Sequence, residues 1–221
     1  MFEYAVDRDY IGNSPFYKMK RVIKTLRNKS RTRFLTEQEI AQVWAGITNG
    51  GGTAQTKRAL KLILVTTQRP MEVAGLHRRE ISGDWWTLPA ERNLKGIRDH
   101  RIFLTATAKE LIGDSEGFIF PSPMKDTKTR HITRIAMSQH VTGSKHFGVA
   151  PWTPHDLRRT ARTHMSRIRI RREYSEAVLN HAKGGMAQVY DQYEFDDEKM
   201  EALQAWETEL LRLVIQSSTS V

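Results

Sequence analysis

The stretch TPHDLRRTART, residues 153–163, says most about the fold and begins a helix that we expect over about residues 153–167. His155 and Arg158 lie three positions apart, so one face of that helix presents both side chains. Residues 158–172 contain seven arginines and no acidic residue. A block of this kind favours contact with nucleic acid, although a solvated helix face gives the same pattern.

Two further helices are predicted upstream. Thr36 should cap the first, because Glu39 three residues later completes a capping box before an apolar stripe. Residues 49–52, NGGG, break the pattern, and the second helix should span about residues 53–66. Pro70 suits the first position of a short helix that ends near residue 76.

A small sheet is predicted in the middle of the chain. Residues 85–88 and 101–104 have the composition of two hairpin strands, joined by a polar, flexible segment at residues 89–100. Residues 117–120 are typical of a third strand, which Pro121 ends. Further helices are predicted over about residues 129–141, 172–181 and 196–216. The predicted fold class is therefore mainly α with a small antiparallel β-sheet (α+β).

The composition suits one domain with a short appendage and a polyanionic partner. The chain has 221 residues, 39% of them hydrophobic, which is enough for a core, and its net charge is +10. Residues 18–33 form a second basic block, with eight basic residues and no acidic one. The absence of cysteine excludes disulfides, thiolate zinc sites and cysteine nucleophiles, and fits a reducing compartment. The apolar runs are too short to span a membrane.

Four separated segments carry residues suited to catalysis. Taken alone, each has an ordinary explanation: an arginine beside a glutamate is usually a structural ion pair, and a lysine in a hairpin tip usually aids solubility. A His-x-x-Arg pair is more often at a surface, and a tyrosine is more often packed against a core. In chain order, the residues are Arg69 with Glu72, Lys95, His155 with Arg158, and His181 with Tyr190 nine positions later.

The order and spacing of these residues resemble the tyrosine recombinase family, which includes phage and genomic-island integrases. RTRFLTEQEIAQVW at residues 31–44 is similar to the usual entry to the catalytic domain of these integrases. TPHDLRRTART is similar to their histidine–arginine box, and YDQYEFDDEK at residues 190–199 to their tyrosine box. The resemblance extends from about Arg33 to the C-terminus and implies the fold of a DNA breaking-rejoining catalytic domain.

Two positions depart from the family pattern, and neither touches a catalytic group. Asn180 stands where the family usually has the glycine of a Leu-Gly-His motif. Glycine there permits a turn with positive φ, and asparagine is the best non-glycine residue for such a turn. The arginine box reads Gln-Arg-Pro-Met-Glu, which is a tolerable variant.

The resemblance implies that the enzyme cuts and rejoins DNA strands by transesterification, through a 3′-phosphotyrosyl intermediate. No ATP is expected, since bond energy is kept in the covalent intermediate. No metal or other cofactor is expected either, since no set of clustered carboxylates suggests a magnesium site. Tyr190 would be the nucleophile and His155 the base or proton relay. Lys95 would be the general acid that protonates the leaving 5′-oxygen. Nearby alternatives are Arg98 and Arg101 for the acid, and Tyr193 for the nucleophile.

The other family residues would stabilise the charge that develops on the phosphoryl group. Arg69 and Arg158 would clamp its oxygens, because a guanidinium stays charged and offers a planar fork of donors. His181 would donate one more hydrogen bond to a non-bridging oxygen. Glu72 would hold Arg69 in place without touching DNA.

The predicted domains are a basic linker or N-terminal extension at residues 1–33 and an integrase catalytic domain at residues 34–221, without the usual upstream DNA-binding domains. The expected partner is double-stranded DNA at attachment sites, bound by a homotetramer, with the isolated domain a monomer. We also expect accessory DNA-bending proteins, a location at the nucleoid in the cytoplasm, and no contact with a membrane. The last helix has an apolar face that packs either on its own domain or on a neighbouring protomer. Its residues are Met200, Leu203, Trp206, Leu210 and Val214.

Two other functions stay open at this level. A type IB topoisomerase shares the chemistry but relaxes one duplex instead of exchanging strands between two. A non-catalytic DNA-binding or regulatory protein would keep the fold, although the intact set of six catalytic residue types argues against it. Integration or excision of a phage or genomic island is the favoured function.

Overall fold

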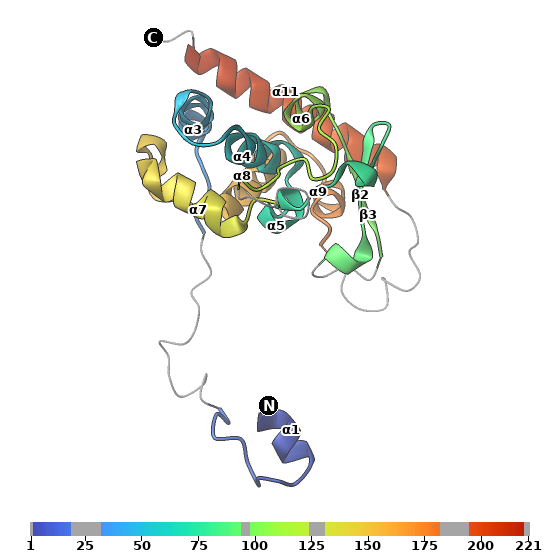
Figure 1. Ribbon diagram of the computed structural model, residues 1–221. Helices are drawn as coiled ribbons and strands as arrows, with labels where there is room; N and C mark the ends of the chain where they lie inside the picture. Colours follow the sequence, from blue (N-terminus) through green and yellow to red (C-terminus); the bar gives the residue numbers. More distant parts are fainter. Residues whose placement is uncertain (1, 19–31, 94–97, 124–130, 182–194, 219–221) are drawn as a thin grey trace. The chain divides into compact units, whose positions relative to one another are not determined.

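The computed structural model describes residues 2–18, 32–93, 98–123, 131–181 and 195–218, and the chain divides into two compact units. The first unit, Met1–Thr32, contains helix α1 (Phe2–Asp7), and its Phe2 ring meets Phe16 edge-on with 5.1 Å between centroids. The sequence predicts no helix there, because residues 1–33 show no clear period. The second unit, Arg33–Val221, holds the sheet and the remaining helices (Figure 1).

Three helices at the start of the second unit follow the predicted caps. They are α3 (Glu37–Asn49), α4 (Ala54–Thr66) and α5 (Pro70–Ala74). The Thr36 hydroxyl accepts from the Glu39 backbone N–H at 3.3 Å, and the Glu39 carboxylate accepts from the Thr36 N–H at 2.8 Å. The predicted capping box is therefore confirmed. At the end of α4, Thr67 has a φ of 61° and turns the chain toward α5.

Three short antiparallel strands form a sheet in the order β1-β2-β3. They are β1 (Ile81–Ser82), β2 (Trp85–Leu88) and β3 (His100–Phe103). Trp85 lies opposite Phe103 and Leu88 opposite His100. The predicted hairpin is confirmed, with its second strand one residue earlier than expected.

The prediction of a third strand at residues 117–120 is wrong. The third strand of the sheet is β1, which pairs with β2 on the side opposite β3. Phe118 forms only an isolated bridge, with His77. Two residues later, the Phe120 carbonyl accepts from the N–H of Ile132 at 2.9 Å. Because the backbone partner changes within two residues, no ladder forms, and the burial of this apolar run comes from core packing.

The rest of the unit is helical, joined by the 3-10 helices η2 (Arg78–Glu80), η3 (Ala90–Arg92) and η4 (Lys145–Gly148). The helices are α6 (Ala106–Ile112), α7 (Arg134–Gly143), α8 (Pro154–Arg167), α9 (Arg172–Val178) and α11 (Asp196–Ser218). The α8 prediction is confirmed. Helix α7 begins later than predicted, because the Thr133 hydroxyl caps it by accepting from the Ala136 N–H at 3.1 Å. Helix α6 was not predicted.

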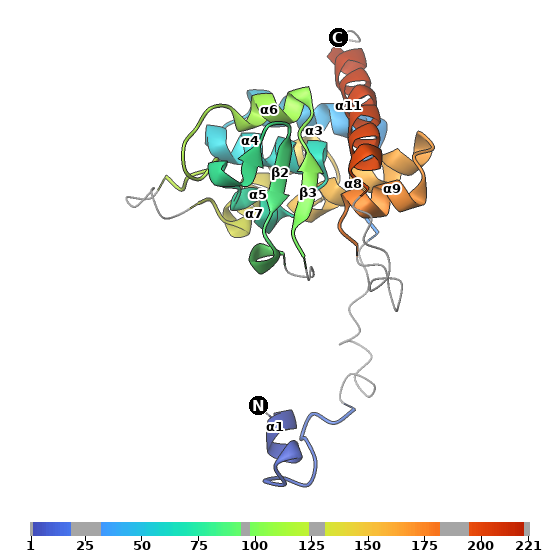
Figure 2. The same cartoon turned by 90° about the vertical axis from the view of Figure 1, so that its right-hand side faces the viewer.

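Helix α11 packs on its own domain, against α3, α9 and β3. Figure 2 shows it running past α3 and α9. The side chains of Leu203, Trp206 and Leu210 are buried, and the Trp206 indole N–H donates to the Leu64 carbonyl on α4 at 2.8 Å. Of the two placements that the sequence leaves open, the structure has the one within the domain.

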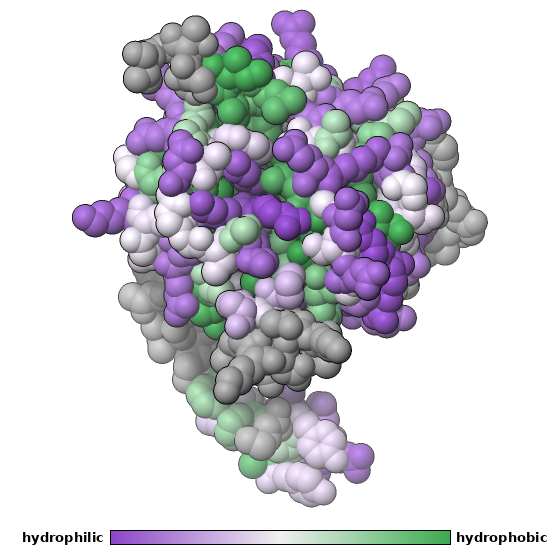
Figure 3. All heavy atoms as spheres, turned by 45° about the horizontal axis from the view of Figure 1, so that its top comes forward, coloured by the Kyte–Doolittle hydropathy of each residue, from purple (hydrophilic) through white to green (hydrophobic). Residues whose placement is uncertain are grey.

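The face of the molecule in Figure 3 is mostly hydrophilic, with apolar residues exposed between polar ones. Within the described ranges, no helix combines the length and the apolar character that crossing a membrane requires.

Candidate active site

The first arginine of the predicted site lies where α5 begins. Glu72 accepts from the Arg69 backbone N–H at 2.8 Å with one carboxylate oxygen and from Arg69 Nη1 at 2.7 Å with the other. The glutamate is buried, with 2% of its surface exposed. One carboxylate therefore fixes both the turn before α5 and the direction of the guanidinium.

The second arginine, Arg158 on α8, is 4% exposed and is bound by backbone carbonyls. Its Nη1 donates to the carbonyl oxygen of Thr67 at 2.6 Å, and its Nη2 donates to that of Leu179. Burial, and after it the positive charge of Arg69, lower the pKa of Arg158 to about 9. The guanidinium thus lies close to Arg69 and joins three segments that are far apart in sequence.

The turn between α4 and α5 is tied to the end of α9 by a second side chain. Gln68 is fully buried, and its Nε2 donates to the carbonyls of Thr66 at 2.8 Å and Val178 at 2.9 Å. Together with Arg158, this amide holds the backbone before Arg69 against the backbone before His181.

The first histidine, His155, lies in the first turn of α8 and is exposed. Partial burial of its ring lowers its pKa, and the charges of Arg158 and Arg159 lower it further. A histidine with a lowered pKa is neutral at physiological pH and is able to accept a proton. This state suits the predicted base.

The second histidine, His181, follows Asn180, whose φ is 49°. The expectation that this asparagine adopts the positive φ of the family glycine is therefore confirmed. The Nδ1 atom of His181 is hydrogen-bonded to Glu176 Oε2. Burial lowers the pKa of His181, Glu176 acts against that shift, and the charges of Arg158 and Arg69 add to it.

Four of the six predicted catalytic residues are thus brought together. Arg158 bonds the backbone two residues before Arg69 and two residues before His181, and His155 lies three positions before Arg158 on the same helix. These contacts place the four residues in one region. Lys95 and Tyr190 lie outside the described residues, and their roles stay predictions.

The alternatives to Lys95 differ in their surroundings. Arg101 forms an ion pair with Asp196 at the start of α11, and its guanidinium lies 4.5 Å from the centroid of the Trp85 ring. Arg98 is exposed. The contacts of Arg101 give it a structural role that joins β3 to α11, which makes it a weaker candidate for the general acid. Tyr193, the alternative nucleophile, lies outside the described residues.

Arg92 and His100 are among the supporting residues that were not predicted from the sequence. Arg92 donates to the Glu72 carbonyl at 2.8 Å and also bonds the Gly75 carbonyl and the Glu80 carboxylate, so it holds the end of α5. A Cβ at Gly75 would lie 3.1 Å from Arg92 Nη2, so glycine leaves room for this guanidinium. Both Arg92 and His100 belong to the polar segment that was expected to be flexible.

His100 links the hairpin to the end of α9. It is buried, and its Nε2 lies 3.2 Å from the Val178 carbonyl oxygen. Burial lowers its pKa to about 3, with the charge of Lys199 as the next cause. The ring is therefore neutral and donates from Nε2. No sequence signal marks this residue, because its partner lies 78 positions away.

The arginine block on α8 is used mostly inside the domain. Besides Arg158, Arg159 pairs with Asp156, and Arg162 pairs with Glu176 at 2.9 Å. Arg167 forms a looser pair with Glu37 at 3.6 Å. The basic run therefore contributes less free positive surface than its composition suggests.

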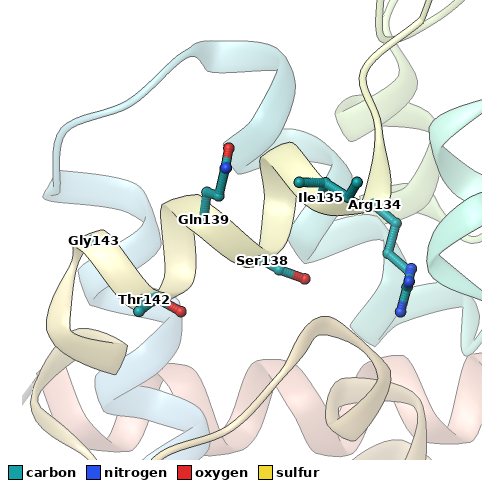
Figure 4. A pocket seen from close by; sticks show the side chains of 6 residues that line it. All are labelled: Arg134, Ile135, Ser138, Gln139, Thr142 and Gly143. Atoms are coloured by element: carbon teal, nitrogen blue, oxygen red, sulfur yellow. The ribbon is translucent and has the colours of Figure 1, made fainter.

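One surface pocket lies away from these groups. It has a volume of about 440 Å³ and is lined by one face of α7, as Figure 4 shows. None of its lining residues is a predicted site residue: they are Arg134, Ile135, Ser138, Gln139, Thr142 and Gly143. The described residues also contain no cluster of three or more side chains suited to hold a metal ion.

Comparisons with known proteins identify the family of the chain. The model of the phage integrase family matches residues 33–196. The integrase from mycobacterium phage Brujita is 17% identical, over 97% of this chain and 72% of that chain, with a TM-score of 0.63. The lambda integrase (75–356) dimer bound to a COC′ core site is 19% identical, over 87% of this chain and 71% of that chain, with a TM-score of 0.58.

The Tn1549 transposon integrase in complex with circular intermediate DNA is 16% identical, over 90% of this chain and 74% of that chain, with a TM-score of 0.57. At these identities, the solved structures show a shared fold. None of the curated proteins matches the sequence. The family model, in contrast, covers most of the chain. The chain therefore belongs to the phage integrase family and is a tyrosine-type site-specific recombinase.

Proposed function

We propose that this chain cuts and rejoins duplex DNA with Tyr190 as its nucleophile and with Arg69, Lys95, His155, Arg158 and His181 as the other catalytic residues. One observation supports this assignment above all. Two arginines and two histidines from three separate segments surround one site, and the arginines are fixed before any substrate arrives. Positive groups fixed in advance stabilise a developing negative charge without the cost of reorganisation.

The cleavage step is a transesterification. The phenol oxygen of Tyr190 attacks the phosphorus, a P–O bond to Tyr190 forms and the P–O5′ bond breaks. A free phenol has a pKa of about 10, so His155 takes its proton during the attack. Lys95 gives a proton to the leaving 5′-oxygen. A 5′-hydroxyl from a second strand reverses these transfers, and the recombined strand is released.

Arg69 and Arg158 bind the non-bridging oxygens of the phosphoryl group. A guanidinium has five N–H donors, and Arg158 uses at least two of them on the carbonyls of Thr67 and Leu179. The others are available for phosphate. Glu72 and the two carbonyls hold the planes of these guanidinium groups, which makes two-point binding of a phosphate possible.

The proposed substrate is an attachment site in double-stranded DNA, recombined by four copies of the chain. Related folds support this part: one lambda integrase structure is a dimer bound to a core site, and another is a tetramer bound to a Holliday junction. We further propose integration or excision of a phage or genomic island, with help from DNA-bending proteins, at the nucleoid.

A suicide substrate tests the nucleophile. A duplex with a nick near the cleavage site loses the short strand after attack and traps the protein on DNA. We expect the wild-type protein and the matched control Tyr193→Phe to form a covalent adduct and Tyr190→Phe to form none while still binding DNA. An adduct with Tyr190→Phe, or a labelled peptide that does not contain Tyr190, would overturn the assignment.

Adduct formation, relaxation of supercoiled DNA and strand exchange together separate the alternative functions. A type IB topoisomerase would form the adduct and relax supercoiled DNA without joining strands from two duplexes. A non-catalytic DNA-binding protein would form no adduct with any substrate. The proposed recombinase should form the adduct and also exchange strands between two marked duplexes.

A further inference from the structure

The His181 ring is hydrogen-bonded to the carboxylate of Glu176, and both oxygens of that carboxylate have hydrogen-bond partners. Glu176 on α9 uses Oε2 for the bond with His181 Nδ1. Its Oε1 accepts two bonds from Arg162 on α8, from Nε at 3.2 Å and from Nη2 at 2.9 Å. Arg162 Nη1 also donates to Ser166 Oγ at 2.5 Å. Each oxygen of Glu176 therefore has its own partner.

This carboxylate decides which nitrogen of His181 carries a proton. Burial acts to raise the pKa of Glu176, but the bonds from Arg162 and His181 outweigh it and lower the pKa below its ordinary value. The group is therefore ionised near neutral pH. An ionised carboxylate only accepts hydrogen bonds, so Nδ1 of His181 must donate. In the neutral ring, Nε2 is then a bare acceptor.

A phosphate oxygen also accepts only, so neutral His181 in this tautomer cannot donate to it from Nε2. The imidazolium form, in contrast, has an N–H on both nitrogens. The charged groups that affect the ring are Arg158 on α8, Glu176 on α9 and Arg69 just before α5. Arg162 on α8 contacts the ring's partner, Glu176. A bound phosphate adds negative charge beside the ring and favours the imidazolium.

We propose that Glu176 is a positioning residue that makes His181 act on the scissile phosphate as an imidazolium, with Nδ1–H directed to Glu176 and Nε2–H directed to the phosphate. This inference rests on the proposed function, which supplies the phosphate. Arg162 belongs to the same arrangement, because it occupies Oε1 and leaves Oε2 for the histidine. Neither Glu176 nor Arg162 was among the residues predicted from the sequence.

The substitution Glu176→Gln removes the negative charge of this side chain and keeps its size and shape. Arg162 has only donors to offer, so it will bind the amide oxygen of the glutamine. The amide NH₂ then faces Nδ1 of His181, which must accept. Neutral His181 will therefore carry its proton on Nε2 and donate to phosphate without being charged. Glu173→Gln is the matched control, because Glu173 is exposed on the same helix and the substitution changes the charge in the same way.

Nitrogen-15 NMR of histidine-labelled protein measures the tautomer directly, with the His181 signals identified by their loss in His181→Gln. The wild-type protein and Glu173→Gln should show a neutral ring protonated on Nδ1, and Glu176→Gln a neutral ring protonated on Nε2. A wild-type ring protonated on Nε2 would overturn the proposal.

The pH dependence of single-turnover cleavage of the suicide substrate tests the consequence. The rate ratio of wild type to Glu176→Gln should fall by about 10-fold between about pH 5 and about pH 8, because the wild-type donor is lost as the imidazolium deprotonates. The ratio of wild type to Glu173→Gln should stay constant. If the wild-type protein forms the adduct normally but the rate ratio of wild type to Glu176→Gln does not change with pH, the role of Glu176 is wrong and the proposed function stands. No wild-type adduct at any pH counts against the proposed function.

Discussion

Arg158 Nη1 donates to the carbonyl oxygen of Thr67 at 2.6 Å, so the second arginine of the site binds the backbone two residues before the first. The left-handed conformation of Thr67, with a φ of 61°, belongs to the turn that presents this carbonyl. A shift of either arginine therefore requires a change in the same turn. The positions of the two guanidinium groups are therefore coupled through the backbone of this turn.

Substitution of Arg158 should affect cleavage far more than DNA binding. Arg158→Lys has a single cationic centre, which cannot bond the Thr67 and Leu179 carbonyls and also bind a phosphate in two places. We expect cleavage to slow by about 10³-fold or more, as for loss of a phosphate-binding arginine in phosphoryl transfer. Single-turnover adduct formation measures this effect. The control Arg167→Lys changes an exposed pair with Glu37 and should cut at close to the wild-type rate.

Replacement of Lys95 should be rescued by a better leaving group. If Lys95 protonates the 5′-oxygen, Lys95→Ala should cut ordinary DNA slowly and a 5′-bridging phosphorothiolate at a rate near that of wild type, because a thiolate leaves without a proton. Adduct formation on the two substrates measures the ratio. Rescue of Arg98→Ala in place of Lys95→Ala would move the role to Arg98.

His100 should make the folded state sensitive to acid. Burial and the charge of Lys199 lower its pKa to about 3, whereas an unfolded histidine titrates near 6.5. As the pH falls below about 6.5, the unfolded chain takes up a proton that the folded chain excludes, so stability declines by up to about 1.4 kcal/mol per pH unit until about pH 3.

The variant His100→Gln keeps a donor for the Val178 carbonyl but does not titrate. Between about pH 7 and about pH 5, its free energy of unfolding should fall by about 2 kcal/mol less than that of the wild-type protein. Urea unfolding at the two pH values measures this difference. Equal losses in the two proteins would show that His100 takes up its proton without penalty.

Trp206 should be one of the residues that matter most for stability. Its side chain is fully buried and its indole N–H donates to the Leu64 carbonyl, so Trp206→Ala should lower the free energy of unfolding by about 3–5 kcal/mol. Leu211→Ala, on the same helix but 36% exposed, should cost far less. Chemical unfolding of both variants measures the difference, and similar losses would mean that α11 contributes little to the core.

The elements that the sequence predicts best are those whose signals are local. Thr36 and Glu39 cap α3 within three residues, and the arginine-rich stretch predicts α8 by itself. The strand at residues 117–120 was wrong because an apolar run reports burial, not the identity of the backbone partner. Helix α6 has no side-chain cap at Thr105 and spans seven residues, which leaves little pattern to detect.

The residues of the site also differ in how well the sequence predicts them. The resemblance marks the catalytic candidates, and the structure brings Arg69, His155, Arg158 and His181 into one region. Apart from Glu72, the groups that hold them were not foreseen, because their partners are distant in sequence: Arg92 binds a carbonyl 20 positions away, and Gln68 one that is 110 positions away. Only a folded structure reveals such pairs.

The hydrogen bond between Trp206 and Leu64 has a practical consequence. Leu64 lies on the last turn of α4, three residues before the carbonyl that binds Arg158. The C-terminal helix therefore supports the same turn that Arg158 binds. Proteolytic cleavage of the chain before Trp206 should therefore abolish the recombinase activity.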